Sequence, residues 1–236
     1  MLKIPAFAKR QNVIANADSQ LHKTTMRRLT IALLTLIVSF SVSFGQSDHL
    51  EPAKDFSKYD SITGGILYNY YNPLFDILLA DLSKTPLARY LVLPSFTAEY
   101  VLSIEKDTNE KYKLTTHICS DNFWYSKDKK AITIKTKEKT IEADFAIKIK
   151  ELFDKFTGQI KEPPTNNSAR VDGTSYYFTT TNSSGQLITG KTWSPDKGTN
   201  MRKLVQICED IYYFTNAKTS NSATIVADIN KILGDL

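Results

Sequence analysis

A run of fourteen uncharged residues near the start of the chain decides which part of it can fold as a globular domain. The run, Leu29 to Val42, follows Arg27 and Arg28 and ends at Ser43-Phe44-Gly45, where small residues precede Gln46. A basic segment, a short apolar segment and a small-residue step are the three parts of a secretory signal peptide. A membrane-spanning helix usually needs about 20 apolar residues, so cleavage before Gln46 is favoured over an uncleaved anchor.

This interpretation divides the chain into four parts. Residues 1–25 are predicted to be an over-extended start or a disordered leader, because Met26 begins a conventional signal by itself. Residues 26–45 are the predicted signal peptide, 46–61 a polar lead-in, and 62–236 a single α+β domain. The expected product is an exported protein, periplasmic or secreted, that meets the membrane only through the signal segment during export.

The charge of the chain is concentrated in the segment expected to be removed. Residues 1–45 carry six basic side chains and one acidic side chain, which accounts for the formal net charge of +5. The remaining 191 residues hold 24 basic and 24 acidic side chains. A neutral domain lacks the positive potential that binding to polyanions requires, so nucleic acid is not an expected partner.

Two cysteines, Cys119 and Cys208, follow the predicted cleavage point, and they are 89 residues apart. An exported protein meets an oxidising environment, which permits a disulfide between them. A bridge across so long a loop would add about 4 kcal/mol of stability by the chain-entropy argument. The alternative is two buried thiols that behave as small apolar side chains.

The periodicity of apolar residues predicts strands and helices in a mixed order. Apolar side chains at helical spacing predict four helices, at 61–83, 144–157, 199–214 and 220–233. Within the first, Asn72 followed by Pro73 is a typical helix start. Alternating side chains predict strands at 98–105, 112–118 and 131–137, and a hairpin of 175–181 with 186–193. A connector is expected between Pro86 and Pro94.

These elements predict an α+β fold. Hairpins join neighbouring antiparallel strands, so the expected sheet is antiparallel and built from hairpins. The helices are expected to pack on one face of that sheet, which would leave the other face to solvent. A cleavable signal helix would precede this domain.

The candidates for catalytic and metal-binding chemistry are weak. His117 and Cys119 share one face of a predicted strand, but catalytic pairs are usually assembled from distant segments. Zinc sites need four ligands in paired short spacings, and the set of His49, His117, Cys119 and Cys208 lacks that pairing. No Gly-x-Ser-x-Gly elbow or phosphate-binding glycine loop occurs. We therefore expect no catalytic residue, metal or cofactor from the local sequence.

A lysine ridge spans the predicted strand 131–137 and the residues on both sides of it, and it comprises Lys127, Lys129, Lys130, Lys135, Lys137 and Lys139. It has two interpretations. One is contact with an anion or a polymer. The other, which we favour because Asp128 and Glu138 interrupt the ridge, is an exposed edge strand that lysine protects from aggregation.

Aromatic residues at predicted turns are the best candidates for contact with a ligand or partner. Trp124 and Tyr125 end one strand, and Trp193 ends another. Aromatic rings that are partly exposed at loop ends bind sugars, peptides or proteins. The alternative is that the tryptophans close the ends of the hydrophobic core, since tryptophan is highly buried on average.

The resulting hypothesis is an exported, soluble bacterial protein that acts as a non-catalytic binding or protein-interaction module. Its expected partner is a protein, a peptide or a saccharide. A secreted or periplasmic hydrolase is one alternative, because carboxylates or Cys/His groups can assemble an active site only in three dimensions. An inhibitor or immunity-type protein with a convex contact surface is the second.

Overall fold

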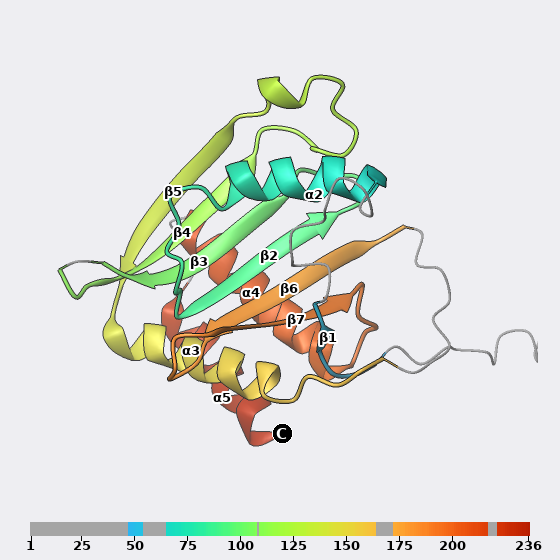
Figure 1. Cartoon of the computed structure of the whole chain (residues 1–236). Coiled ribbons are helices and arrows are strands. Elements are labelled where there is room, and N and C mark those ends of the chain that lie inside the picture. Colours follow the sequence, from blue (N-terminus) through green and yellow to red (C-terminus); the bar gives the residue numbers. More distant parts are fainter. Residues whose placement is uncertain (1–46, 54–64, 108, 164–171, 217–220) are drawn as a thin grey trace, which may run out of the picture. The chain divides into compact units, whose positions relative to one another are not determined.

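The computed structural model describes residues 47–53, 65–107, 109–163, 172–216 and 221–236 (Figure 1). The predicted leader, the signal peptide and most of the lead-in lie outside these residues. The described residues belong to one compact unit, 46–236. Within these ranges, every helix is too short or too polar to cross a bilayer.

A single antiparallel sheet forms the centre of this unit. In the described residues it has seven strands, in the order β1-β7-β6-β2-β3-β4-β5. The strands are β1 (Glu51–Pro52), β2 (Ala88–Pro94), β3 (Tyr100–Lys106), β4 (Tyr112–Cys119), β5 (Ile134–Ile141), β6 (Thr174–Thr181) and β7 (Leu187–Trp193). Every pairing in this sheet is antiparallel, and the predicted hairpin of β6 and β7 is confirmed.

Four α-helices in the described ranges complete the predicted α+β fold. They are α2 (Gly65–Leu78), α3 (Ala143–Thr157), α4 (Asn200–Asn216) and α5 (Ser222–Gly234). The expectation that all helices lie on one face is wrong. Helices α3, α4 and α5 share one hydrophobic cluster with the sheet, whereas α2 belongs to a second cluster on the opposite face (Figure 1).

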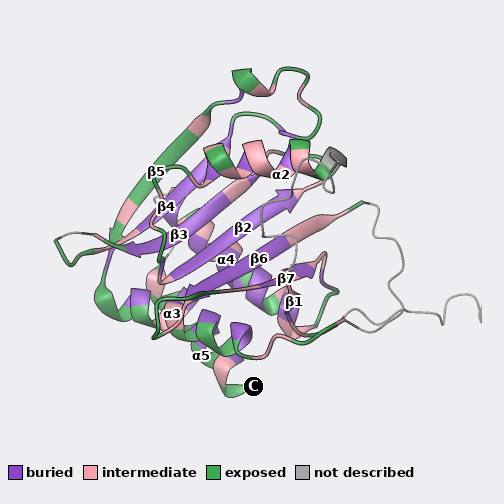
Figure 2. Cartoon of the chain, viewed as in Figure 1, coloured by how far each residue is buried: buried purple, intermediate pink, exposed green. Residues whose placement is uncertain are grey.

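Strand β2 explains why both faces are covered. The sequence predicts a connector here, but the segment is a central strand, paired with β3 on one side and with β6 on the other. Tyr90 and Val92 face the cluster of α3, α4 and α5, and Leu91 and Leu93 face α2. A continuous apolar run is typical of a strand buried on both faces, and Figure 2 shows β2 buried along most of its length.

Helix α2 runs through Pro73, although Asn72-Pro73 resembles a helix start. Proline inside a helix removes one backbone hydrogen bond and clashes with the preceding turn. Packing outweighs this cost, because Tyr70, Leu74 and Leu78 are buried against the sheet on both sides of the proline. The local signal at residue 73 is therefore overridden by tertiary contacts.

Residues 47–53 are part of the fold and not a loose lead-in. Leu50 is 0% exposed within the main core, and its carbonyl accepts a hydrogen bond from Lys161 N at 3.0 Å. The Asp48 carboxylate accepts from Met201 N at 2.9 Å, in the first turn of α4. Gly190 permits this docking, because a Cβ there would lie 2.8 Å from the Cβ of Leu50. The chain therefore closes the sheet edge beyond β7.

Strand β5 lies at the other edge of the sheet and is mostly exposed, so the predicted edge position is confirmed, and protection from aggregation stays a prediction. Lys137 and Lys139 donate to the carbonyls of Asn216 and Phe214, at 3.2 and 2.9 Å. These carbonyls belong to the last turn of α4, whose C-terminal end attracts positive charge. The Lys139 ammonium also lies 3.5 Å from the Phe214 ring centroid. These two lysines thus hold a helix end against the sheet.

The docking of residues 47–53 predicts a strong dependence of stability on Leu50. Leu50→Ala should lower the free energy of unfolding by about 2–5 kcal/mol, because it leaves a cavity in the main core. Ile147→Ala is the matched control, since Ile147 is 53% exposed on α3, and it should change that energy by less than about 0.5 kcal/mol. Urea unfolding of both variants measures the difference. Equal effects would contradict the docking.

Candidate functional site

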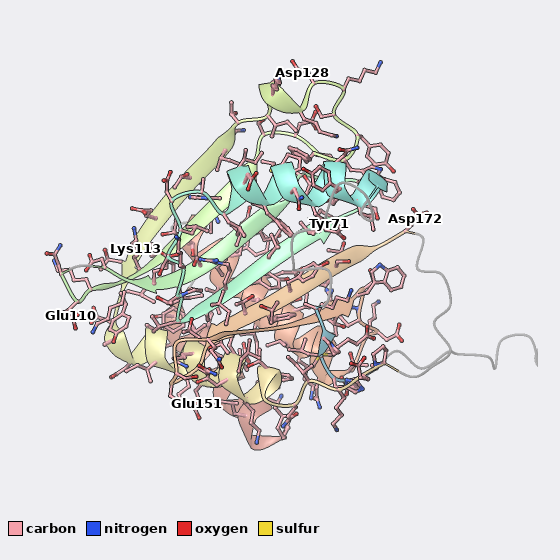
Figure 3. The ribbon with its side chains drawn as sticks, viewed as in Figure 1. Tyr71, Glu110, Lys113, Asp128, Glu151 and Asp172 are labelled. Carbon is pink, nitrogen blue, oxygen red and sulfur yellow. The ribbon has the colours of Figure 1, made fainter. Side chains whose placement is uncertain are left out.

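A cleft of about 460 Å³ opens at one end of the sheet. Its walls come from the first half of α2, the end of β2, the start of β6, the end of β7 and the loop that joins β4 to β5. Five of its lining residues are aromatic: Tyr70, Tyr71, Trp124, Tyr125 and Trp193. Five others are polar: Ser95, Asp172, Ser175, Lys191 and Thr192. Figure 3 labels Tyr71 on α2 and Asp172 at the start of β6.

The structure brings the three aromatic residues singled out from the sequence, Trp124, Tyr125 and Trp193, to this one cleft. Trp124 is 39% exposed and Tyr125 is 61% exposed, so neither closes the core as a buried plug. Trp193 is half-buried and approaches from the opposite wall, at the end of β7. Their role in contacting a ligand remains a prediction, but their convergence is a property of the fold.

The aromatic surface continues beyond the cleft through an aromatic rim, which we define as Phe96, Trp124 and Tyr125. The rings of Phe96 and Tyr125 are nearly parallel, with an interplanar angle of 6° and centroids 6.2 Å apart. Phe96 is 66% exposed. Trp124 contacts Tyr70 edge-on at 4.8 Å, so the rim is fixed to α2. The rim therefore carries exposed aromatic rings, and its contact with α2 restricts their position.

A buried carboxylate, Glu99, holds the loop that carries Trp124 and Tyr125. Glu99 is 0% exposed. Its Oε2 accepts from Phe123 N at 2.8 Å, and its Oε1 accepts from the Tyr70 hydroxyl at 3.0 Å. The same side chain thus joins the start of β3, the loop and helix α2. A buried carboxylate needs such partners, because leaving it unpaired in the protein interior is costly.

Burial also alters the proton affinity of this pair. Desolvation raises the pKa of Glu99, against the opposing effect of its hydrogen bonds from Phe123 and Tyr70. Desolvation and the nearby Glu99 carboxylate raise the pKa of Tyr70 well above its usual value. Tyr70 therefore remains a hydroxyl donor to Glu99. Tyr70 lines the cleft, whereas Glu99 supports the loop from beneath and does not line the cleft.

Two further side chains stabilise the loop through hydrogen bonds to backbone groups. The Asn122 amide donates to the carbonyl of Thr97 at 2.7 Å and accepts from Tyr125 N at 2.9 Å. The Lys129 ammonium donates to the carbonyl of Phe123 at 2.8 Å and lies 4.9 Å from the centroid of that ring. Lys129, part of the lysine ridge, is thus another internal support. Figure 3 labels Asp128 near the tip of this loop.

The opposite wall is held by backbone contacts around Gly173. The Ser95 backbone N and its hydroxyl both donate to the carbonyl of Gly173, at 2.9 and 2.8 Å. A Cβ at residue 173 would lie 2.6 Å from Cζ2 of Trp193. Only glycine allows the backbone to approach the indole this closely. This contact ties the start of β6 to the end of β7.

His117 and Cys119 share the α2 face of β4, as predicted, but they do not form an activated pair. His117 Nδ1 lies 3.0 Å from the carbonyl of Leu78, and neither residue lines the cleft. Desolvation and the Glu99 carboxylate raise the pKa of the Cys119 thiol to about 12. A nucleophilic cysteine needs the opposite shift, so this thiol acts as a buried apolar group.

The disulfide that the sequence permitted is absent, because the sheet separates the two cysteines. Cys119 and Cys208 are both free. Cys119 lies in the cluster under α2, and Cys208 lies in the cluster on the opposite face. Of the candidate metal ligands, Cys208 is thereby separated from Cys119 and His117. Within the described ranges, no three His, Cys, Asp or Glu side chains are grouped to hold a metal ion.

Sequence reasoning missed Glu99, Tyr70 and Asp172. Glu99 is a single carboxylate between Ala98 and Tyr100 in a segment of otherwise apolar or hydroxyl side chains. This pattern was the available signal, since an isolated charge in a buried strand needs a partner. Tyr70 and Asp172 carry no local signal, because only the sheet brings them to the cleft.

The buried Glu99 predicts a pH-dependent contribution to stability. Its raised pKa means that the folded state keeps its proton to higher pH than the unfolded state does, whose pKa is about 4.3. This contribution is fully present below about pH 4.3 and is lost as the pH rises through the folded-state pKa. The wild type minus Glu99→Gln difference in unfolding free energy should therefore fall as pH rises.

Urea unfolding between about pH 4 and pH 8 measures this difference, since the shared titrations of other groups cancel. A difference that stays constant across this range would show that Glu99 does not titrate with a raised pKa.

Both cysteines should be titratable without reductant. Denaturation of untreated protein should expose two reactive thiols for each chain, because the cysteines lie on opposite faces of the sheet. In the native state both should react slowly with a thiol reagent, since each is buried and has a raised pKa. A count below two after denaturation would contradict the arrangement of the sheet.

Comparison with known proteins identifies no relative from which a role could be transferred. No protein-family model matches the chain, and neither the curated proteins nor the solved structures gave a significant match. A function for this chain must therefore be inferred from the cleft itself and from the residues that hold it.

Proposed function

We propose that this chain is an exported, non-catalytic binding module that captures its ligand in the aromatic cleft. The observation that carries the proposal is the convergence of Trp124, Tyr125 and Trp193 on one concave site. Trp124 and Tyr125 come from the loop between β4 and β5, and Trp193 comes from the end of β7, far away in the sequence. Ligand sites are typically concave and combine aromatic side chains with polar groups that fix orientation, and this cleft is lined by five residues of each kind.

The walls of the cleft are held before any ligand arrives. Glu99 fixes the loop that carries the rim, and Ser95 fixes the start of β6. Rigid support reduces the entropy lost when a ligand binds, so contact energy is converted into affinity more efficiently. These buried hydrogen bonds therefore support a binding role for the rings that they position.

The hydrolase alternative is less well supported by the cleft. A glycosidase-like site needs two carboxylates that face the same substrate. Among the described residues that line the cleft, Asp172 is the single carboxylate, and Glu99 is enclosed beneath the loop. Cys119 and His117 are buried away from the cleft. The concave shape of the site also favours a ligand-binding module over an inhibitor with a convex contact surface.

Export is part of the proposal and has its own test. Mass spectrometry of the periplasmic or secreted fraction should find a chain that begins at Gln46, because the small residues Ser43 and Gly45 fit a signal-peptidase site. An intact Met26 in that fraction would contradict cleavage. Retention of the whole product in the cytosol would contradict export.

Trp124→Ala should weaken ligand capture at least about tenfold, because it removes an exposed aromatic ring that lines the cleft. Wild type and variant are compared on an oligosaccharide array and a peptide array, and melting temperature is recorded for both. Tyr213→Ala is the control, since Tyr213 is 56% exposed on α4 and lies outside the cleft lining. Capture that survives in Trp124→Ala, or no capture by the wild type, would contradict the proposal.

A further inference from the structure

We propose that the ligand of the aromatic cleft is a neutral oligosaccharide. This inference rests on the proposed binding function and names the class of ligand for the same site. It follows from three properties of the described residues: which backbone groups are already paired, which ring faces are exposed, and which polar side chains line the cleft.

The cleft offers little opportunity for a peptide to bind as an added strand. Strands β2 and β6 are paired on both sides, and β1 occupies the outer edge of β7 at Gly190 and Lys191. At the strand ends, Ser95 N donates to the carbonyl of Gly173, and Ser194 N donates to the carbonyl of Thr174. Strand addition needs unpaired main-chain groups along an edge. Recognition in this cleft must therefore rely mainly on side chains.

The exposed rings present flat apolar faces of the kind that stack on a sugar ring. Trp124 and Tyr125 are exposed at the cleft, and the exposed ring of Phe96 stacks beside that of Tyr125. One face of a pyranose carries C–H groups, whereas its hydroxyls project around the edge. An aromatic face can bury the C–H face while the hydroxyls reach polar groups beside it.

The polar residues of the cleft match those hydroxyls. Asp172 is exposed at the start of β6, and its ionised carboxylate can only accept hydrogen bonds. Ser175 can donate or accept. A sugar hydroxyl both donates and accepts, so it can pair with either of these side chains. A proline-rich peptide, the other ligand that aromatic grooves favour, has few N–H groups to offer Asp172.

The charges of the cleft also point to a neutral ligand. Among the described residues, its lining holds one acidic side chain, Asp172, and one basic side chain, Lys191. Polyanionic ligands are bound by clusters of lysine and arginine, and cationic ligands by a local excess of carboxylates. The lysine ridge does not supply such a cluster here, because none of its six lysines is among the described residues that line the cleft.

The two tryptophans of the chain, Trp124 and Trp193, both line the cleft, so intrinsic fluorescence reports directly on this site. The full chain is titrated with cellotetraose, chitotetraose and maltotetraose, and with a ten-residue proline peptide. At least one tetrasaccharide should give a saturable change in emission.

Calorimetric titration then measures affinity in variants whose melting temperatures match the wild type. Trp124→Ala should weaken binding of that tetrasaccharide about tenfold, and Asp172→Ala about fivefold through the loss of a charged acceptor. Tyr213→Ala should bind as the wild type does.

Three results would overturn the inference. If the proline peptide binds in a Trp124-dependent manner and no tetrasaccharide does, the cleft is a peptide site, and the binding function survives without its proposed ligand class. If a tetrasaccharide binds equally to Trp124→Ala, the sugar site lies elsewhere. If no probe perturbs the emission, neutral oligosaccharide is not the ligand, and the array comparison decides the binding function separately.

Discussion

The burial of strand β2 on both faces is the constraint on which the rest of the structure depends. Its apolar side chains point to both sides of the sheet, and each side needs its own cover. Helices α3, α4 and α5 supply one cover, and α2 supplies the other. Because α2 must lie on the second face, Tyr70 and Tyr71 are placed at the end of the sheet, where one wall of the cleft forms.

Glu99 transmits this arrangement to the site. Glu99 directly precedes β3, the strand beside β2, and its carboxylate joins helix α2 to the loop between β4 and β5. Removing a carboxylate from water is costly, and the hydrogen bonds from Tyr70 and Phe123 offset that cost only if helix and loop are both in place. The rim is therefore positioned by a buried polar network and not by the aromatic rings alone.

Several side chains that suggest chemistry in the sequence prove to have structural roles. Cys119 and His117 pack under α2, and Lys137 and Lys139 bind the carbonyls at the end of α4. In each case the sequence could not indicate the structural role, because the partner of the side chain lies on another helix or strand. The aromatic residues were equally ambiguous in the sequence, and the exposure of Trp124 and Tyr125 at the cleft distinguishes these two from core residues.

The sequence by itself determined the antiparallel hairpins, helices α3, α4 and α5, and the three aromatic candidates, because alternation, helical spacing and turn residues are local signals. It misread Pro73 and β2, since a proline and a short apolar run have local preferences that packing overrides. Only the tertiary structure decided that α2 covers the second face, that the cysteines are separated, and that Trp124 and Trp193 share a cleft with Asp172. The physical reason is that these relations depend on strand order and on long-range burial, which no spacing along the chain encodes.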